Sequence, residues 1–377
     1  MPLGLVGTAY CELNNQKMKP NSLSEAIIRE QLQSIQDPYL GLDLIAAKIV
    51  KKIDLSDTKV SIVLKFGYPV QEAHPVIQTI SKILEPLLGD VALQITSSWK
   101  VNPHAAQNGL KPVANIKNII AVASGKGGVG KSTTAINLAL GISVLGARVG
   151  LLDADIYGPS QPHMLGTKEK PALREDKRLE PIVKYDLQTM SMGYLVDDGP
   201  MVWRGPMVST ALQQLLNETA WDNLDYLIVD LPPGTGDIQL TLAQKIPVAA
   251  AVIVTTPQEV ALLDAKKALM MFKKLGISIV GIIENMSTHI CTECGHHEAI
   301  FGVGGGEKLA TEFEIPLLAK LPLDSRIQQQ SDAGRPSIVE EPEGSIAQLY
   351  HELALQVTAK LSLQARDYTV ASPRLVE

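Results

Sequence analysis

Residues 124–134 read SGKGGVGKSTT, and residues 125–132 within them fit the phosphate-binding pattern G-x-x-x-x-G-K-[ST]. The apolar run NIIAVAS leads into the glycines, and a helical pattern follows them. Glycines let a backbone adopt positive φ and approach a phosphate closely, and successive N–H groups at a helix N-terminus bind its charge. The stretch therefore predicts a strand, a phosphate-binding loop and a helix in succession. The alternative is a glycine-rich turn that binds nothing.

Two side chains in the pattern have roles that follow from its spacing. Lys131 is expected to reach the β- and γ-phosphates of a nucleotide and to act in catalysis, and Ser132 is expected to bind Mg²⁺ through its hydroxyl. The loop residues expected to contact the nucleotide are Gly125, Lys126, Gly127, Gly128, Val129, Gly130, Lys131, Ser132 and Thr133.

Short apolar runs rich in valine and isoleucine recur after the loop. They are RVGLLDAD, DYLIVDLP, VAAAVIVTTP and ISIVGIIENM, and several are followed by helical patterns. Continuous apolar runs are typical of strands buried on both faces, as in a parallel sheet covered by helices. The sequence therefore predicts an α/β fold with a mostly parallel sheet, whose functional residues lie at the carboxyl ends of the strands.

Polar side chains stand at three of those strand ends. Asp153 and Asp155 end one apolar run, and Asp230 ends another. We expect Asp155 to position an attacking water and Asp230 to hold the magnesium shell. Helix N-capping is the alternative for each aspartate, and a supporting role is a further one for Asp153. Asn285 is placed to bond an adenine edge, or it is an ordinary loop asparagine.

Lys126 is a second lysine in the loop, and it lies too early to share easily the phosphate that Lys131 of the same chain contacts. It could reach the phosphate of a second chain across a face-to-face dimer and neutralise charge there during phosphoryl transfer, as an arginine finger does. This interpretation predicts a symmetric homodimer with two nucleotides at its interface and a catalytic role for Lys126. The alternative is a solvated surface lysine.

Cys291 and Cys294 form a C-x-x-C pair, whose spacing lets two thiolates bind one metal centre. Two thiolates are half of a four-ligand site. A two-fold dimer would bring two pairs together around an iron–sulfur cluster, and the dimer inferred from Lys126 favours this solution. A redox dithiol is a second possibility. In a third, one chain would complete a zinc site by itself with a neighbouring histidine, namely His289, His296 or His297.

The composition limits the classes of partner. A net charge of −6 argues against broad binding of nucleic acid or anionic membranes, and an aromatic content of 4% argues against a base-stacking platform. Three cysteines in 377 residues, one of them Cys11, indicate no disulfide framework. We recognise no signal peptide and no apolar run of membrane-spanning length. A cytoplasmic protein with neither nucleic-acid nor membrane partners is therefore expected.

The chain is expected to contain two domains. In the first, LSEAIIREQLQSI and HPVIQTISKILEPLL have helical spacing, while KVSIVLKF and VALQITSSW suggest strands, which together make a small α+β domain. The predicted segments are an N-terminal extension (1–22), the small domain (23–100), a linker (101–116), the nucleotide-binding domain (117–362) and a loose tail (363–377).

Residues 117–340 resemble the Mrp/ApbC family of iron–sulfur cluster carrier ATPases, which belong to the deviant Walker A class of P-loop proteins. The resemblance rests on SGKGGVGKSTT, LLDADIYGPSQPHMLG, DYLIVDLPPGTGDIQLTLAQ, GIIENMS, CTECG and IFGVGGGEKLA. It implies a homodimer that binds and hydrolyses ATP with Mg²⁺. It also implies a 4Fe–4S cluster bridged by Cys291 and Cys294 and passed to apo iron–sulfur proteins. Lys126 falls on the family's signature lysine.

Residues 23–100 resemble the small domain that is often fused ahead of this ATPase and is related to the cluster-assembly machinery. Related domains often carry a cysteine where this chain reads FGYPVQEAHP, so partner docking or support of the dimer is expected here rather than metal binding. Two other functions compete with the carrier. One is a positioning ATPase acting on membrane or DNA, and the other is a zinc-bound nucleotide-binding scaffold.

Overall fold

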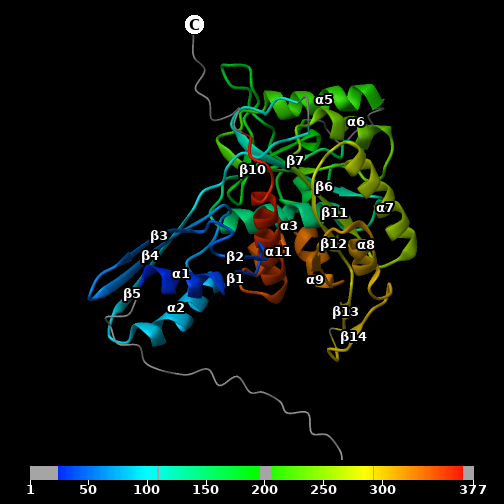
Figure 1. Cartoon of the computed structure of the whole chain (residues 1–377). Coiled ribbons are helices and arrows are strands. Elements are labelled where there is room, and N and C mark those ends of the chain that lie inside the picture. Colours follow the sequence, from blue (N-terminus) through cyan, green and yellow to red (C-terminus); the bar gives the residue numbers. More distant parts are fainter. Residues whose placement is uncertain (1–23, 108–109, 196–204, 292, 368–377) are drawn as a thin grey trace, which may run out of the picture. The chain divides into compact units, whose positions relative to one another are not determined.

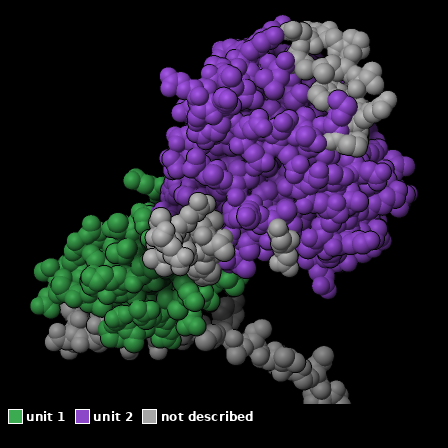
Figure 2. All heavy atoms as spheres, turned by 90° about the horizontal axis from the view of Figure 1, so that it is seen from above, with its two compact units in different colours: residues 1–65, 72–98 green, residues 66–71, 99–377 purple. Residues whose placement is uncertain are grey.

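The computed structural model describes residues 24–107, 110–195, 205–291 and 293–367. The chain divides into two compact units, coloured separately in Figure 2. The smaller comprises Met1–Lys65 and Glu72–Ser98, and the larger comprises Phe66–Gln71 and Trp99–Glu377. Cys11 and the predicted extension 1–22 lie outside the described residues.

The smaller unit combines helices with short antiparallel strands. Strand β4 alternates buried and more exposed side chains, as its sequence predicts, and α2 buries Val76, Ile80 and Leu84 on one face. Its sheet has the order β3-β4-β5, of which β3 escaped the sequence prediction. The elements are α1 (Glu25–Gln33), β1 (Gln36–Asp37), β2 (Leu42–Asp43), β3 (Val50–Leu55), β4 (Lys59–Phe66), α2 (Pro75–Leu88) and β5 (Ala92–Trp99).

The larger unit is built on a sheet that has eight strands in the described part of the chain, in the order β15-β12-β11-β6-β10-β7-β9-β8 (Figure 1). Neighbouring strands are parallel except for β8, which runs antiparallel to β9. The predicted mostly parallel α/β sheet is therefore confirmed. The strands are β6 (Ile116–Ser124), β7 (Val149–Asp153), β8 (Ile182–Lys184), β9 (Leu187–Ser191), β10 (Leu224–Asp230), β11 (Ala250–Thr255), β12 (Ile279–Glu284) and β15 (Leu317–Lys320).

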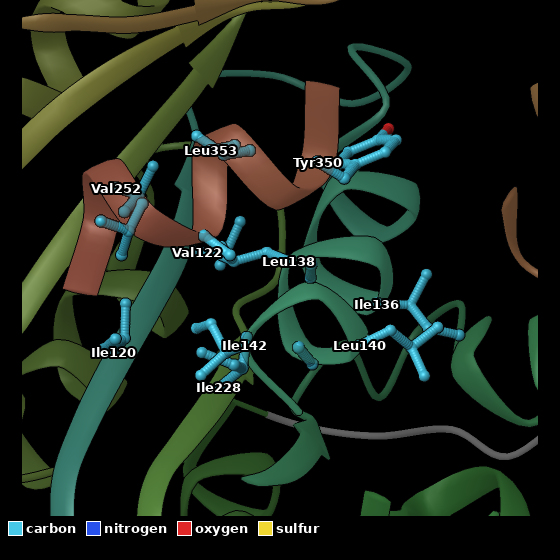
Figure 3. Packing of buried hydrophobic residues seen from close by; sticks show 14 of the residues in the cluster. Ile120, Val122, Ile136, Leu138, Leu140, Ile142, Ile228, Val252, Tyr350 and Leu353 are labelled. Atoms are coloured by element: carbon cyan, nitrogen blue, oxygen red, sulfur yellow. The ribbon is translucent and has the colours of Figure 1, made fainter. Parts of the chain in front are cut away.

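Helices cover both faces of this sheet. On one face, side chains of β6, β10 and β11 meet those of α3 and α11 (Figure 3). On the other, the same strands pack against α5, α6 and α7, which explains why their sequences are apolar without alternation. The helices are α3 (Lys131–Val144), α4 (Gln161–Met164), η2 (Met192–Tyr194), α5 (Gly205–Glu218), α6 (Asp237–Lys245), α7 (Glu259–Lys274), α8 (Gly305–Phe313), α9 (Ser325–Asp332), α10 (Ser337–Glu340) and α11 (Ser345–Ser362).

The predicted linker and the start of the predicted tail are tied into the larger unit. The main-chain N–H of His104 donates to Asn118 Oδ1 on β6 (3.0 Å), and that of Ala105 donates to the carbonyl of Ala365 (2.8 Å). Gln107 donates to two carbonyl groups at the end of α6. Residues 101–107 are thus bonded to the larger unit along their length. Residues 363–367, which were expected to belong to a loose tail, are bonded to them. Among the described helices, none combines the length and apolar character needed to cross a bilayer.

Candidate nucleotide and cysteine sites

The predicted phosphate loop connects β6 to α3 at the carboxyl edge of the sheet. Gly128 and Gly130 adopt left-handed φ values of 78° and 80°, and Gly130 is the N-cap of α3. At Gly125 a Cβ atom would lie 2.1 Å from the main-chain carbonyl carbon of Asp264 on α7. The glycines are therefore required by the backbone conformation at two positions and by a close approach to α7 at the third.

The two lysines of the loop have different surroundings. Lys131 is buried, its ammonium forms an ion pair with Asp230, and it also lies 3.1 Å from Ser132 Oγ. Lys126 is partly exposed, and its ammonium forms no ion pair with any residue that the structure describes. Its main-chain carbonyl accepts from Ser124 Oγ at 2.9 Å, which holds the start of the loop.

The acidic residues gather because their strands are neighbours. Asp153 and Asp230 are register partners at the ends of β7 and β10. Burial, followed by the nearby Asp230 carboxylate, raises the pKa of Asp153 to about 7, and burial also raises the pKa of Asp155. The N-caps of α4 and α6 are Ser160 and Gly236, so none of the three aspartates caps either helix.

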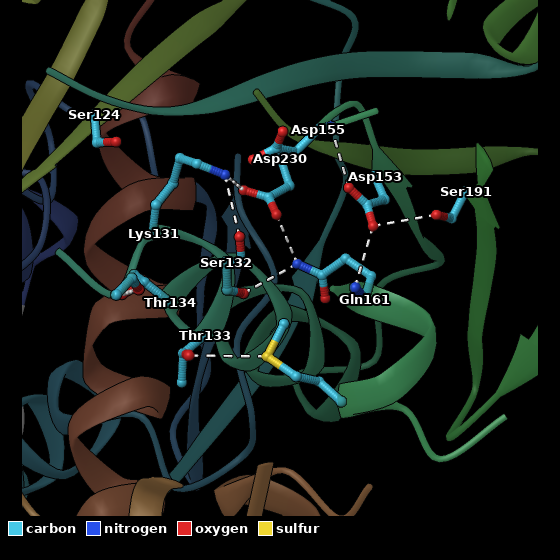
Figure 4. Close-up of polar contacts among 12 residues, drawn as sticks. Ser124, Lys131, Ser132, Thr133, Thr134, Asp153, Asp155, Gln161, Ser191 and Asp230 are labelled. Atoms are coloured by element: carbon cyan, nitrogen blue, oxygen red, sulfur yellow. Dashed lines mark hydrogen bonds and ion pairs between the residues drawn. The ribbon is translucent and has the colours of Figure 1, made fainter. Parts of the chain in front are cut away.

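Gln161 completes this cluster, and sequence reasoning missed it (Figure 4). Its Nε2 donates to Asp230 Oδ2 (2.9 Å) and to the carbonyl of Ser132 (3.1 Å). Its main-chain N–H donates to Asp153 Oδ2 (3.1 Å), which also accepts from Ser191 Oγ (3.1 Å). The signal in the sequence was weak, because an uncharged glutamine beside Pro162 at a helix start has many ordinary explanations.

Asn285 follows β12 and lies against the phosphate loop. Its main-chain N–H donates to the carbonyl of Thr255 (2.8 Å), and its Nδ2 donates to the carbonyl of Val129 (2.9 Å). A Cβ atom on Gly130 would lie 2.1 Å from the same Nδ2. Asn285 therefore supports the loop, and its contact with an adenine edge stays a prediction.

Cys291 and Cys294 are free thiols on a small hairpin formed by β13 (His289–Ile290) and β14 (His297–Glu298). Cys294 is exposed and Cys291 is half-buried. The N–H of Cys291 donates to the carbonyl of His296, and the N–H of Gly295 to that of Cys291, both at 2.9 Å. Main-chain N–H groups of Cys294 and Glu293 lower the pKa of the Cys291 thiol, which favours the thiolate that binds metals.

The histidines near this pair are not arranged around it. His289 places Nδ1 3.1 Å from the carbonyl of Leu323, while His296 and His297 are exposed. Among the described residues, no three or more His, Cys, Asp or Glu side chains are grouped as they would be around a single metal ion. In a single chain, this hairpin therefore supplies two thiols as candidate metal ligands.

The chemistry of the cluster at the sheet edge fits a magnesium nucleotide. The Ser132 hydroxyl and the carboxylates of Asp230 and Asp155 are the oxygen donors that Mg²⁺ prefers. Lys131 and the N–H groups at the start of α3 fit phosphate oxygens. A parallel sheet with this loop at its carboxyl edge defines the class of P-loop NTPases.

Comparison with known proteins gives the family. The family described as NUBPL iron-transfer P-loop NTPase matches residues 115–358, and the family described as iron-sulfur cluster assembly protein matches residues 25–95. The chain belongs to this family of iron-transfer P-loop NTPases. Two relatives named iron-sulfur cluster carrier protein are similar over most of the chain. That of Haemophilus influenzae is 47% identical over 89% of this chain and 92% of its own length. That of Escherichia coli K12 is 46% identical over 93% and 95%.

Solved structures are similar over a little less than two thirds of the chain. A nucleotide-binding protein from Archaeoglobus fulgidus, in complex with ADP, is 38% identical with a TM-score of 0.54 and covers 63% of this chain and 93% of its own. The cell division ATPase MinD of Pyrococcus furiosus is 22% identical with a TM-score of 0.51 over 64% of this chain and 98% of its own. The latter likeness concerns the fold alone.

Proposed function

We propose that this iron–sulfur cluster carrier binds and hydrolyses ATP with Mg²⁺, and that it holds a 4Fe–4S cluster between two copies of the chain for delivery to apo-proteins. The observation that carries the proposal is that the nucleotide-site residues and the two thiols are connected through one sheet. Asn285, the residue directly after β12, contacts the phosphate loop, and the chain then runs on to the hairpin with Cys291 and Cys294.

In the proposed ATPase, four side chains and the loop backbone each have a separate role. Lys131 turns from Asp230 to the phosphates, and the loop N–H groups hold the phosphate oxygens. Ser132 and Asp230 hold Mg²⁺, which when bound neutralises charge on the phosphates. Asp155 orients the attacking water. What supports these roles is that Lys131 and Ser132 begin α3 after the loop that follows β6, while Asp155 lies just after β7 and Asp230 ends β10.

The proposed homodimer rests on an incomplete site and on an apolar surface. One chain supplies two thiols, and a 4Fe–4S cluster requires four. Helix α7, which contacts the loop at Gly125, exposes Val260 and Leu263, with relative exposures of 61% and 62%. A partner copy that covers this part of α7 would also place a phosphate within reach of Lys126, whose ammonium has no described ion-pair partner.

The first test is anaerobic reconstitution with iron and sulfide. Wild type is compared with Cys291→Ser/Cys294→Ser, and Cys11→Ser is the matched control. We expect brown protein with about four irons per dimer in wild type and control, and loss of both iron and dimer-bound sulfide in the double variant. Colourless wild-type protein that retains zinc would refute the carrier proposal and leave a zinc-bound nucleotide-binding scaffold.

The second test concerns hydrolysis. Lys126→Ala is expected to bind ATP with near wild-type affinity while losing ATP turnover, since the lysine is proposed to act on the nucleotide of the partner chain. Mixing Lys126→Ala with Asp155→Ala should restore part of the turnover, because one composite site then has both residues. Mixed samples that remain inactive would contradict action in trans.

A further inference from the structure

Gln161 lies at the centre of the polar cluster, and the function proposed above assigns it no task. It is 1% exposed, and it comes from the first turn of α4, outside the phosphate loop. Its one side-chain NH₂ group donates to Asp230 Oδ2 and to the carbonyl of Ser132 (Figure 4). It is therefore bonded to both residues that are proposed to hold magnesium.

The orientation of this amide is fixed by its neighbours. A carboxylate and a main-chain carbonyl only accept hydrogen bonds, so the nitrogen of Gln161 must face Asp230 and Ser132. The amide oxygen is buried and has no hydrogen-bond partner among the described residues. A third bond, from the Gln161 main-chain N–H to Asp153 Oδ2, holds the residue's main chain in the same cluster.

The bonds of Asp230 indicate what the amide does. Asp230 Oδ1 is paired with the Lys131 ammonium, and Oδ2 accepts from Gln161. When Lys131 turns to a phosphate, Oδ1 loses its partner while Oδ2 retains the glutamine. A fully buried carboxylate that kept no hydrogen bond would have nothing to fix its orientation. The glutamine keeps Asp230 in one orientation while its cationic partner changes.

We propose that Gln161 is a positioning residue for magnesium, which sets the spacing between Ser132 and Asp230 through its two donated hydrogen bonds. This inference rests on the proposed function, because it presumes that these two residues hold the ion. It adds a group that touches neither nucleotide nor metal and that acts only through the residues it bonds. Its removal should weaken the binding of Mg²⁺ while leaving the phosphate loop itself intact.

The test measures binding of a fluorescent ATP analogue to the full-length protein, first in EDTA and then as Mg²⁺ is added. In Gln161→Met the half-saturating Mg²⁺ concentration is expected to rise about tenfold, the effect of losing a hydrogen bond to a charged group. The dissociation constant in EDTA should stay within about twofold, because the loop and Lys131 are unchanged. Gln161→Asn retains an amide with shorter reach and should shift the Mg²⁺ requirement in the same direction. If Gln161→Met does not fold, the Mg²⁺ requirement of Gln161→Asn tests the inference in its place.

The matched control is Gln330→Met, which removes another buried glutamine amide, one on α9 whose Nε2 donates to Glu341 Oε1. It should leave both measurements unchanged. Equal losses with and without Mg²⁺ in the Gln161 variants would show a merely structural role and overturn the inference, as would an unchanged Mg²⁺ requirement. Wild-type protein whose ATP binding ignores Mg²⁺ would instead refute the magnesium site of the proposed function, and the inference with it.

Discussion

The buried ion pair between Lys131 and Asp230 gives a prediction about stability. In nucleotide-free protein, Lys131→Met should lower the free energy of unfolding by about 3–5 kcal/mol, the cost of leaving one member of a buried pair uncompensated. The Lys131 side chain is 6% exposed and that of Asp230 is 0% exposed. The methionine keeps the apolar stem of the lysine, so the expected loss comes from the charge that remains on Asp230.

A second lysine–aspartate pair in the same unit provides the control. Lys117 at the start of β6 pairs with Asp225 at the start of β10 at 2.6 Å, but its side chain is 37% exposed. Water solvates this ammonium and reduces the contribution of the ion pair to stability. Lys117→Met should therefore lower the free energy of unfolding by about 1 kcal/mol or less. Both aspartates lie on β10, and both variants exchange lysine for methionine, so burial is the main difference between them.

The assay is urea unfolding of nucleotide-free protein in EDTA, followed by both circular dichroism and fluorescence, whose coincidence tests for a single transition. Adding Asp230→Asn to Lys131→Met should recover at least half of the loss, because the uncompensated charge is removed. A Lys131→Met variant that loses no more stability than Lys117→Met would refute the reasoning. So would a double variant less stable than Lys131→Met alone.

Three further outcomes follow from the same site. Gly125→Ala should lower the free energy of unfolding by about 1–3 kcal/mol and weaken ATP binding, because its Cβ would overlap the main chain of Asp264. Thermal unfolding measures the first effect, and nucleotide titration measures the second. Asn285→Ala removes the bond to the Val129 carbonyl and should weaken ATP binding about two- to tenfold; wild-type affinity would contradict this. Asp153→Asn should flatten the pH dependence of stability. The folded-state pKa of about 7 exceeds the ordinary 3.8, so folded protein holds a proton that the unfolded chain has lost. Stability therefore falls as pH rises through this window, by up to about 1.4 kcal/mol per unit, and urea midpoints of wild type and variant at pH 4–8 measure the difference.

The fold was largely predictable because its central strands have a strong sequence signal. The strands β6, β7, β10, β11 and β12 are buried on both faces, so each reads as a continuous apolar run. The strands β8, β9 and β15 at the sheet margins are short and of mixed polarity, and the sequence did not reveal them. The strands β8 and β15 are more exposed than the central strands, whereas β9 is largely buried but carries the polar residues Gln188, Thr189 and Ser191, so none of the three gives a continuous apolar run.

The site was predictable only in part, because its assembly depends on strand order. Sequence patterns placed Asp153 and Asp230 at strand ends, but only the position of β10 between β6 and β7 makes them direct neighbours. The raised pKa of Asp153 follows from that adjacency. Gln161 could not be found in this way, because its importance lies in two acceptors from distant segments and not in its own chemistry.

The charge arrangement of the nucleotide-free site has a thermodynamic consequence for the proposed function. Lys131 already has a buried carboxylate partner, so binding of phosphate is an exchange of one anion for another rather than a simple gain of an ion pair. The exchange leaves Asp230 buried and without a cation, which is costly unless another cation arrives. Binding of the nucleotide and of Mg²⁺ are then coupled, and by linkage each must strengthen the other by the same factor. A lysine that was solvated before ATP arrived would produce no such coupling through Asp230. The buried pair is therefore a physical reason for this chain to prefer the magnesium complex of ATP over the free nucleotide.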